Sequence, residues 1–374
     1  MKFTEVNPFN KKIQNKINKS VIKTIQKKDF ILGENVKKFE IKFSKLSNSK
    51  YAIGCATGTD ALLLALKSLN LKKNHEVIIP GMSYISTGLC VALNNNKIIF
   101  ADIDDDTGLI SIDSVKKKLS KNTKVIIPVN LYGQKVNLKQ LRKIVGKNVS
   151  IIEDSAQSHF SYSCYDCGNG MNEICCKKER NHTYADISCY SFYPSKNLGA
   201  YGDGGIVTTN NRSLYNKINI LRNLGAVKKN LHDYEGLNSR LDTIQASVLL
   251  EKIKYSNSHN DYRRMISNFY DENLSHISDI KLTLSNPGSS RHLYVIRVKN
   301  RNKLSKYLLK NKIPIQYHYP YSLNKTGALK NKIKKVKLVN SEKWAKECIS
   351  LPLYPFMPLN EAKRVVSFIK KFYR

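Results

Sequence analysis

The chain has 374 residues, 41% of them hydrophobic, and carries a formal net charge of +34. This length is enough for two domains, or for one large domain with a smaller one. No apolar run approaches the roughly 20 residues of a membrane span, and the N-terminus lacks a secretory apolar region, so we expect a cytoplasmic protein without a membrane partner. The lysines are spread along the chain rather than grouped in a basic module with interleaved aromatics, which argues against a nucleic-acid partner.

The first 50 residues have the pattern of two helices separated by a break at Gly33. The first helix is expected within residues 14–28 and the second within residues 31–48. We predict that residues 1–30 form an N-terminal arm.

Between Tyr51 and Asn210 the chain alternates between short apolar runs and helical patterns. Nearly unbroken Val/Ile runs separated by helices are typical of a mainly parallel sheet covered on both faces, so we predict an α/β domain with seven strands. The expected strands are residues 51–57, 76–81, 97–103, 124–133, 150–156, 185–193 and 204–210. The expected helices between them are residues 60–69, 83–95, 111–119 and 137–145.

After a helix predicted at residues 241–257, the pattern changes to a mixture of helices and strands. We therefore predict a large domain over residues 31–254 and a smaller α+β domain over residues 255–374. The expected elements of the smaller domain are helices at 259–274 and 360–373 and strands at 291–300 and 313–319.

Lys196 follows a strand-like run and a proline, and precedes the turn-rich sequence GAYGDGG and a second strand. A lysine held at a strand end between two sheet elements is poorly placed for a solvated charge and well placed for a reactive amine. We predict that Lys196 carries a cofactor as a Schiff base.

A turn after the first predicted strand has the composition of a phosphate site. Thr57, Gly58, Thr59 and Asp60 open the helix at 60–69. Exposed N–H groups and the helix dipole favour an anion there, and Gly58 lets the backbone approach it closely. The alternative is an ordinary strand–helix turn, since such turns often carry Gly and Thr.

Four further residues have side chains suited to a charged cofactor. Asp154 follows a buried strand and would keep a pyridine nitrogen protonated, although a helix N-cap is the alternative. The Ser191 hydroxyl lies five residues before Lys196, within reach of a phosphate. Asn238 and Arg240 offer an amide and a planar anion-binding group, although capping of the next helix is again the alternative. A phosphate turn, a strand-end Asp and a strand-flanked Lys, in this order, are the parts that pyridoxal phosphate (PLP) requires.

Eight motifs, in chain order, resemble those of the DegT/StrS family of PLP-dependent nucleotide-sugar aminotransferases. They are ILGENVKKFE, GTDALLLAL, IIPVNLYGQ, EDSAQS, SFYPSKNLGAYGDGG, NSRLDTIQA, HYPYSLNK and SLPLYP. The resemblance covers nearly the whole chain. It implies the aspartate-aminotransferase fold (fold type I) and a homodimer whose active sites lie at the subunit interface.

The resemblance also implies a role for each candidate residue. Lys196 would be the Schiff-base lysine and proton carrier, Asp154 would contact the pyridine nitrogen, and Gln157 would lie near the ring hydroxyl. The phosphate would be held by Gly58, Thr59 and Ser191, with Asn238 reaching in from the partner subunit. Tyr84 would stack on the ring, and Arg240 of the partner subunit, His318 and Tyr319 would face the sugar nucleotide or the amino donor.

The implied reaction is the transfer of the amino group of L-glutamate to a keto-sugar linked to dTDP or UDP, in glycan or surface polysaccharide synthesis. PSKNLGAYGDGG and HYPYSLNK are more similar to family members acting on 3-keto sugars than to 4-keto members, whose lysine is usually followed by TTGEGG. Relatives that dehydrate sugars carry His where this chain has Lys196, so a dehydratase is the less favoured enzyme. A PLP-binding regulator or a polyanion-binding protein is the non-enzyme alternative, and rests only on the net charge.

A cysteine-rich insert at about residues 161–183 departs from the family pattern. Cys164, Cys167, Cys175 and Cys176, with His182 nearby, have spacings compatible with zinc, although free thiols in a reducing compartment are the favoured interpretation and no metal is expected. The other four cysteines lie singly in apolar surroundings and are expected to be small buried hydrophobes. They are Cys55, Cys90, Cys189 and Cys348.

Overall fold

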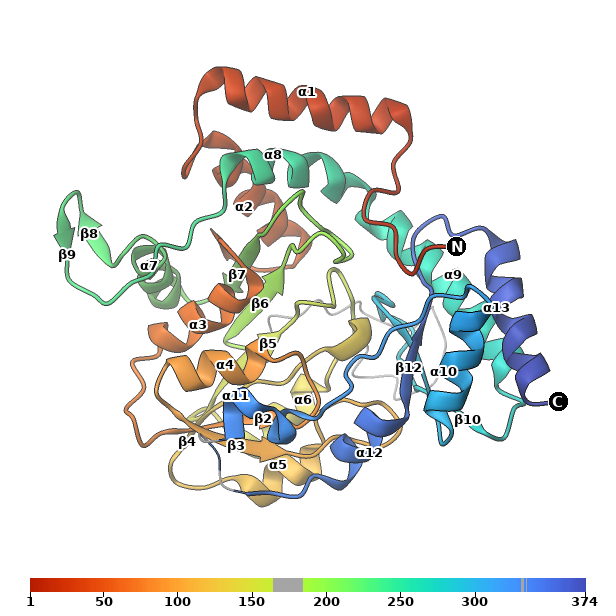
Figure 1. The fold of residues 1–374 in the computed structure, drawn as a ribbon. Coiled ribbons are helices and arrows are strands. Elements are labelled where there is room, and N and C mark those ends of the chain that lie inside the picture. Colours follow the sequence, from red (N-terminus) through yellow and green to blue (C-terminus); the bar gives the residue numbers. More distant parts are fainter. Residues whose placement is uncertain (164–183, 331–332, 334) are drawn as a thin grey trace.

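Figure 1 shows the fold in a computed structural model, which describes residues 1–163, 184–330, 333 and 335–374. A seven-stranded sheet lies at its centre, with the strand order β1-β7-β6-β5-β4-β2-β3. The strands are β1 (Tyr51–Cys55), β2 (Glu76–Pro80), β3 (Lys97–Ala101), β4 (Thr123–Ile126), β5 (Ser150–Asp154), β6 (Ile187–Ser191) and β7 (Gly205–Thr209). Six of them lie within the predicted runs and β4 begins one residue before its run, so the predicted sheet is confirmed.

The sheet is mixed and mainly parallel. β7 runs antiparallel to its neighbours β1 and β6, whereas the β6–β5, β5–β4, β4–β2 and β2–β3 pairs are parallel. The strands are short and almost fully buried, because helices cover both faces of the sheet. These helices are α2 (Glu34–Leu46), α3 (Gly58–Ser68), α4 (Ser86–Leu93), α5 (Ile112–Lys118), α6 (Leu138–Val145), α7 (Arg212–Leu221) and α8 (Thr243–Lys252).

The helix α1 (Lys11–Lys27) lies across α8 at the edge of the molecule (Figure 1). Its N-cap Asn10 accepts a hydrogen bond from the Ile13 backbone N–H, which fixes where the helix begins. The residues before it run back to the C-terminal part, where the Leu353 N–H donates to the Phe3 carbonyl at 3.3 Å. The N-terminal arm therefore contacts both parts of the chain.

The C-terminal part is built on a three-stranded antiparallel sheet, ordered β10-β11-β12, with its own apolar core. Its strands are β10 (Ile280–Leu282), β11 (Tyr294–Val298) and β12 (Cys348–Leu351). Its helices are α9 (Ser256–Leu274), α10 (Arg301–Lys310), α11 (Gly327–Lys330), α12 (Val339–Glu347) and α13 (Leu359–Phe372). The remaining short elements are β8 (Ala226–Lys228), β9 (Leu231–His232) and the 3-10 turns η1 (Leu131–Gly133), η2 (Ile253–Tyr255) and η3 (Leu323–Lys325).

The predicted strand at residues 313–319 is wrong. Only Gln316 forms a bridge, with Ser350 of β12, and the segment forms no longer ladder. The chain then turns toward the large sheet, because the carbonyl of His318 accepts a hydrogen bond from the Tyr132 hydroxyl instead of from a neighbouring strand. A long-range contact thus replaces the ladder that local composition favours.

The two predicted domains also share core residues. Leu323, Leu329 and Leu338, which lie in the C-terminal half of the sequence, pack into the apolar cluster between α3, α4 and the large sheet. The boundary at residues 254 and 255 stays a prediction.

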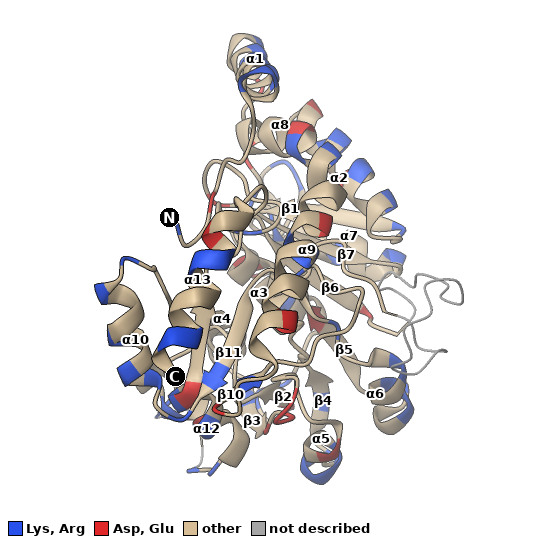
Figure 2. Cartoon of the chain, turned by 90° about the vertical axis from the view of Figure 1, so that its right-hand side faces the viewer, with Lys and Arg blue, Asp and Glu red and all other residues tan. Residues whose placement is uncertain are grey.

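Charge and cysteine distribution follow the sequence pattern. Figure 2 shows Lys and Arg on many helices, including α2, α6, α10 and α13, rather than on one element.

The four single cysteines are free and buried, as predicted, whereas residues 164–183 of the cysteine-rich insert lie outside the described residues. In the described part of the chain, no helix has the length and apolarity needed to cross a bilayer, and no group of three or more His, Cys, Asp or Glu could hold a metal.

Candidate active site

The candidate site lies where β1, β5 and β6 end. These three strands run in the same direction, so their carboxyl ends meet at one edge of the sheet. β5 ends at Asp154 and β6 ends at Ser191, while Gly58 begins α3 directly after β1. Ligands of open α/β sheets bind at this edge.

Asp154 is a buried carboxylate whose partners at hydrogen-bond distance are neutral. Its Oδ2 accepts from the Thr87 hydroxyl at 3.0 Å and its Oδ1 from the Ala156 backbone N–H at 3.1 Å. Burial raises the pKa of Asp154, and these two hydrogen bonds and the Lys196 ammonium oppose the rise. A cation beside this carboxylate would therefore stabilise its ionised form.

Lys196 lies in the connection from β6 to β7, close enough to Asp154 for the two charges to interact. Its backbone N–H donates to the Tyr193 carbonyl at 2.8 Å, which closes the turn that contains Pro194. Burial lowers the pKa of the Lys196 amine to about 8, although the Asp154 carboxylate opposes this effect. The amine is thus partly neutral, and nucleophilic, near neutral pH.

The start of α3 and the end of β6 form a narrow cradle. A Cβ on Gly58 would lie 2.5 Å from the Ser191 Cβ, so only glycine fits at this position. The Thr59 and Ser86 hydroxyls lie 2.7 Å apart beside it. First-turn N–H groups without an intrahelical acceptor, together with hydroxyls, are the usual partners of a phosphate.

Gln157 joins three segments of the site. Its Oε1 accepts from the Tyr132 backbone N–H at 2.7 Å, and its Nε2 donates to the Tyr319 hydroxyl at 3.0 Å. The Tyr319 ring lies 5.8 Å from the ring of Tyr84, which is exposed at the start of α4. The structure therefore brings Tyr84, Gln157 and Tyr319 together, and burial raises the pKa of the Tyr319 hydroxyl so that it stays protonated.

Three imidazoles lie around Lys196, and only His318 was predicted. The pKa of His318 falls to about 4, that of His159 falls to about 3 and that of His292 falls well below its ordinary value, because of burial first and the Lys196 charge second. All three are therefore neutral near pH 7. The ring of His292 is held by the Asn197 side chain at 2.8 Å, and that of His318 by the Ser350 hydroxyl at 2.7 Å.

Asn238 and Arg240 do not join this group within one chain. Asn238 is exposed and bridges to Asn223, and Arg240 donates to the Asn223 side chain at 3.0 Å. Their predicted role at the site of a partner subunit stays a prediction.

Sequence reasoning missed Thr87, Tyr132, His159 and His292. The sequence carried a weak signal for Thr87 alone, which comes three residues after Tyr84 in the same predicted helix. The others lie in segments that only the folded chain brings to Lys196.

The arrangement fits PLP. The cradle at Gly58 would hold the phosphate, the Asp154 carboxylate would face a protonated pyridine nitrogen, and the Lys196 amine would meet the aldehyde. Each position follows from an observed feature of one residue. At Gly58 it is the space that a Cβ would fill, at Asp154 it is a buried carboxylate with neutral hydrogen-bond partners, and at Lys196 it is the lowered pKa of the amine.

A family model described as the DegT/DnrJ/EryC1/StrS aminotransferase family matches residues 11–370. The chain belongs to this family. It is 32% identical to the UDP-2-acetamido-2-deoxy-3-oxo-D-glucuronate aminotransferase of Pseudomonas aeruginosa, over 96% of this chain and 96% of that protein. It is 34% identical to the dTDP-3-amino-3,6-dideoxy-alpha-D-galactopyranose transaminase of Aneurinibacillus thermoaerophilus, over 99% of each chain.

Solved structures of this aminotransferase family share the fold. DesV of S. venezuelae, solved in complex with a ketimine intermediate, matches with a TM-score of 0.92 and 27% identity, covering 100% of this chain and 98% of that chain. The Bacillus subtilis protein ntda, solved with bound cofactor PMP, matches with a TM-score of 0.86 and 27% identity, covering 97% of this chain and 82% of that chain. The predictions of the family, of its fold and of a PLP-dependent sugar aminotransferase are confirmed.

Proposed function

We propose that this aminotransferase uses PLP to move the amino group of L-glutamate to the C3 keto group of a hexose linked to UDP or dTDP. The observation that carries the proposal is the state of the Lys196 amine. Its pKa is about 8, and it lies close enough to the Asp154 carboxylate for the two charges to interact. C3 is supported by the names of the two curated relatives, which specify a 3-oxo and a 3-amino sugar.

The cofactor would be held by residues on three strand ends. Gly58, Thr59 and Ser191 would bind its phosphate, Gln157 would donate to its ring hydroxyl and Tyr84 would cover its ring. Asp154 would hold the proton on the ring nitrogen, because a buried carboxylate is stabilised by an adjacent positive charge. When bound, PLP supplies an electron sink that lets an amino group leave one carbon and join another.

Lys196 would act as the general base and acid of the reaction. A pKa of about 8 lets the Nζ bind and release a proton near neutral pH, so Lys196 would take a proton from the donor's α-carbon and return one to the acceptor sugar. The neutral imidazoles of His159, His292 and His318 add no positive charge near this amine.

The donor and the sugar nucleotide would enter beside His318 and Tyr319. We expect a homodimer in which Asn238 of the partner subunit supports the phosphate and Arg240 of the partner subunit faces the substrate. The exposure of Asn238 in one chain supports this arrangement.

The test uses the PLP-loaded protein with L-glutamate and either a 3-keto or a 4-keto UDP- or dTDP-hexose. We expect the visible absorbance of bound PLP to bleach with L-glutamate and to return with the 3-keto sugar. Return with the 4-keto sugar alone would move amination to C4, the second candidate. Release of water without amino transfer would favour a dehydratase, and bound PLP that does not respond to any amino donor would favour a regulator.

A further inference from the structure

Tyr132 contacts two candidate site segments although it lies outside the predicted site. It is buried in η1, with 2% of its surface exposed. Its backbone N–H donates to Gln157, and its hydroxyl donates to the carbonyl of His318. One residue thus fixes a group from the large sheet and a group from the C-terminal part.

The Tyr132 hydroxyl is itself held by Trp344 of α12. The indole Nε1 donates to this hydroxyl at 3.0 Å, and the two rings stack with their centroids 6.4 Å apart. Because a hydroxyl has one proton, accepting from Trp344 directs that proton to the His318 carbonyl. The Tyr132 hydroxyl therefore accepts from the Trp344 indole and donates to the His318 carbonyl.

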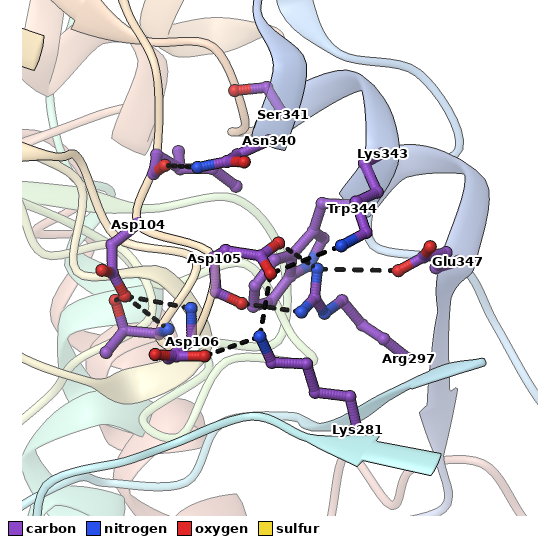
Figure 3. A network of polar contacts seen from close by, with 12 residues as sticks. Asp104, Asp105, Asp106, Lys281, Arg297, Asn340, Ser341, Lys343, Trp344 and Glu347 are labelled. Atoms are coloured by element: carbon purple, nitrogen blue, oxygen red, sulfur yellow. Dashed lines mark hydrogen bonds and ion pairs between the residues drawn. The ribbon is translucent and has the colours of Figure 1, made fainter. Parts of the chain in front are cut away.

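Trp344 is fixed in turn by Arg297 and by the loop after β3. The Arg297 guanidinium lies 4.3 Å from the indole centroid and is bound by the Asp105 carboxylate at 2.6 Å and the Asp105 carbonyl at 2.7 Å. Figure 3 shows Asp105 and Arg297 meeting beside Trp344, with Lys281 and Lys343 also turned toward Asp105. A Cβ on Gly108 would lie 2.7 Å from the indole, so the loop packs directly against it. Trp344 has little freedom to move.

The far end of this series of contacts is Tyr319. The Tyr132 hydroxyl holds the His318 carbonyl, and Tyr319 follows directly, with its own hydroxyl bound to Gln157 at 3.0 Å and its ring 5.8 Å from Tyr84. Movement of the His318 backbone would therefore displace the Tyr319 ring at the candidate ring site. Misplacement of a positioning group by about 1 Å is enough to lower a rate by about 100-fold.

We propose that Tyr132 is a positioning residue that holds His318 and Tyr319 at the reaction centre, and that Trp344 clamps its hydroxyl. This proposal rests on the proposed function, because it assumes that His318 and Tyr319 face the reacting groups of the aminotransferase. Tyr132 itself acts through its neighbours and does not touch the substrate.

The chain offers a matched control in Tyr270. This tyrosine is also buried, and its hydroxyl donates to the Pro352 carbonyl at 3.0 Å within the C-terminal core. Tyr132→Phe and Tyr270→Phe each remove one hydroxyl bound to a backbone carbonyl. Only the first change reaches the candidate site, so loss of stability alone would affect both variants alike.

The kinetic test compares the two PLP-loaded variants with wild type in steady-state turnover with L-glutamate and the 3-keto UDP- or dTDP-hexose. We expect Tyr132→Phe to lower kcat at least about 10-fold while PLP affinity stays within about twofold, because the backbone N–H to Gln157 is kept. Tyr270→Phe is expected to match wild type. Trp344→Phe is expected to lower kcat similarly, and the double variant to be no worse than Tyr132→Phe alone, because both changes act through the Tyr132 hydroxyl.

Two measurements need no substrate. Trp344 is the one tryptophan of the chain, so its fluorescence emission should shift in Tyr132→Phe and stay unchanged in Tyr270→Phe. A crystal structure of Tyr132→Phe should show the Tyr319 hydroxyl displaced from Gln157.

Wild-type kcat in Tyr132→Phe, or an undisturbed contact between Tyr319 and Gln157, would overturn the positioning role. An unchanged emission would overturn the clamp by Trp344. A wild-type protein that does not react with L-glutamate would instead count against the proposed function, and the emission and crystal measurements would still decide the role of Tyr132.

Discussion

At the scale of single residues, the site depends on how burial sets protonation. Burial lowers the pKa of Lys196 to about 8 and raises that of Asp154, while each group partly offsets the shift of the other. The same burial keeps the nearby imidazoles neutral, so that none of the three adds a positive charge beside Lys196. The lowered pKa of the Lys196 amine thus comes from burial and not from a neighbouring charge, since the Asp154 carboxylate acts in the opposite direction.

The pKa of Lys196 predicts how cofactor attachment depends on pH. Only the neutral amine attacks an aldehyde, and the neutral fraction rises about tenfold per pH unit below the pKa and levels off above it. We expect the rate at which PLP-free protein takes up PLP to rise between about pH 6 and pH 8 and then to flatten. Stopped-flow absorbance measures this rate, and Lys196→Ala should show no such absorbance change and no transamination. A rate that keeps rising about tenfold per pH unit from about pH 8 to pH 10 would contradict the lowered pKa.

At the scale of elements, the contact between α3 and β6 defines the cradle. Gly58 opens α3 directly against Ser191 at the end of β6, and β7 supports both from the other side, since a Cβ on Gly205 would lie 2.2 Å from the Thr57 carbonyl. Two glycines therefore set the spacing between one helix and two strands.

Gly58→Ala is expected to weaken PLP binding by at least about 10-fold. The added Cβ would lie 2.5 Å from the Ser191 Cβ, so α3 must shift away from β6 and widen the cradle. Titration of the protein with PLP, followed by absorbance, measures the affinity. Gly327→Ala is the control, because nothing lies within 4 Å of its added Cβ. Equal affinities for the two variants would show that the cradle does not bind the phosphate.

At the scale of the whole molecule, charged contacts join the large sheet to the C-terminal part. Asp105, in the loop after β3, binds Arg297 of β11 at 2.6 Å and Lys281 of β10 at 2.8 Å (Figure 3). These cations hold the pKa of the Asp105 carboxyl well below its usual range. Because the pKa is lower in the folded state, the stabilisation is present above the unfolded value of about 4 and is lost as the pH falls through the folded value.

Asp105→Asn is expected to lower the free energy of unfolding by about 2–3 kcal/mol at pH 7, because the Arg297 side chain, 1% exposed, loses its nearer charged partner and keeps the Glu347 carboxylate at 3.6 Å. The difference from wild type should shrink below about pH 4, where the wild-type stabilisation also fades. Urea unfolding at the two pH values measures both effects. Asp106→Asn is the control: its side chain is 55% exposed and, among the described residues, pairs with Lys281 alone, so a change within about 0.5 kcal/mol is expected.

The expected homodimer predicts complementation between two defective chains. Lys196→Ala and Asn238→Ala should each have little activity alone, because each dimer lacks one of the two groups at both sites. In random heterodimers one site regains both groups, so a mixture refolded together should recover up to about a quarter of wild-type activity. Mixing without subunit exchange is the control. No recovery would place Asn238 in the same subunit's site or outside it.

The local sequence determined the large sheet and the strand-end residues of the site. Apolar runs with a strand period, bounded by turns, predict the seven strands, and chain order then puts Gly58, Asp154 and Ser191 at one edge. These features depend on contacts between near neighbours and on the common direction of parallel strands. A single sequence contains both kinds of information.

Tertiary structure alone decided how the two parts of the chain meet. It turned His318 and Tyr319 out of a predicted strand and into the site, it placed His159 and His292 beside Lys196, and it stacked Trp344 on Tyr132. Such contacts join residues separated by up to 212 positions, as between Tyr132 and Trp344. Hydrophobic period and turn composition describe only local conformation, so they carry no information about which distant side chain satisfies a buried hydroxyl or carbonyl.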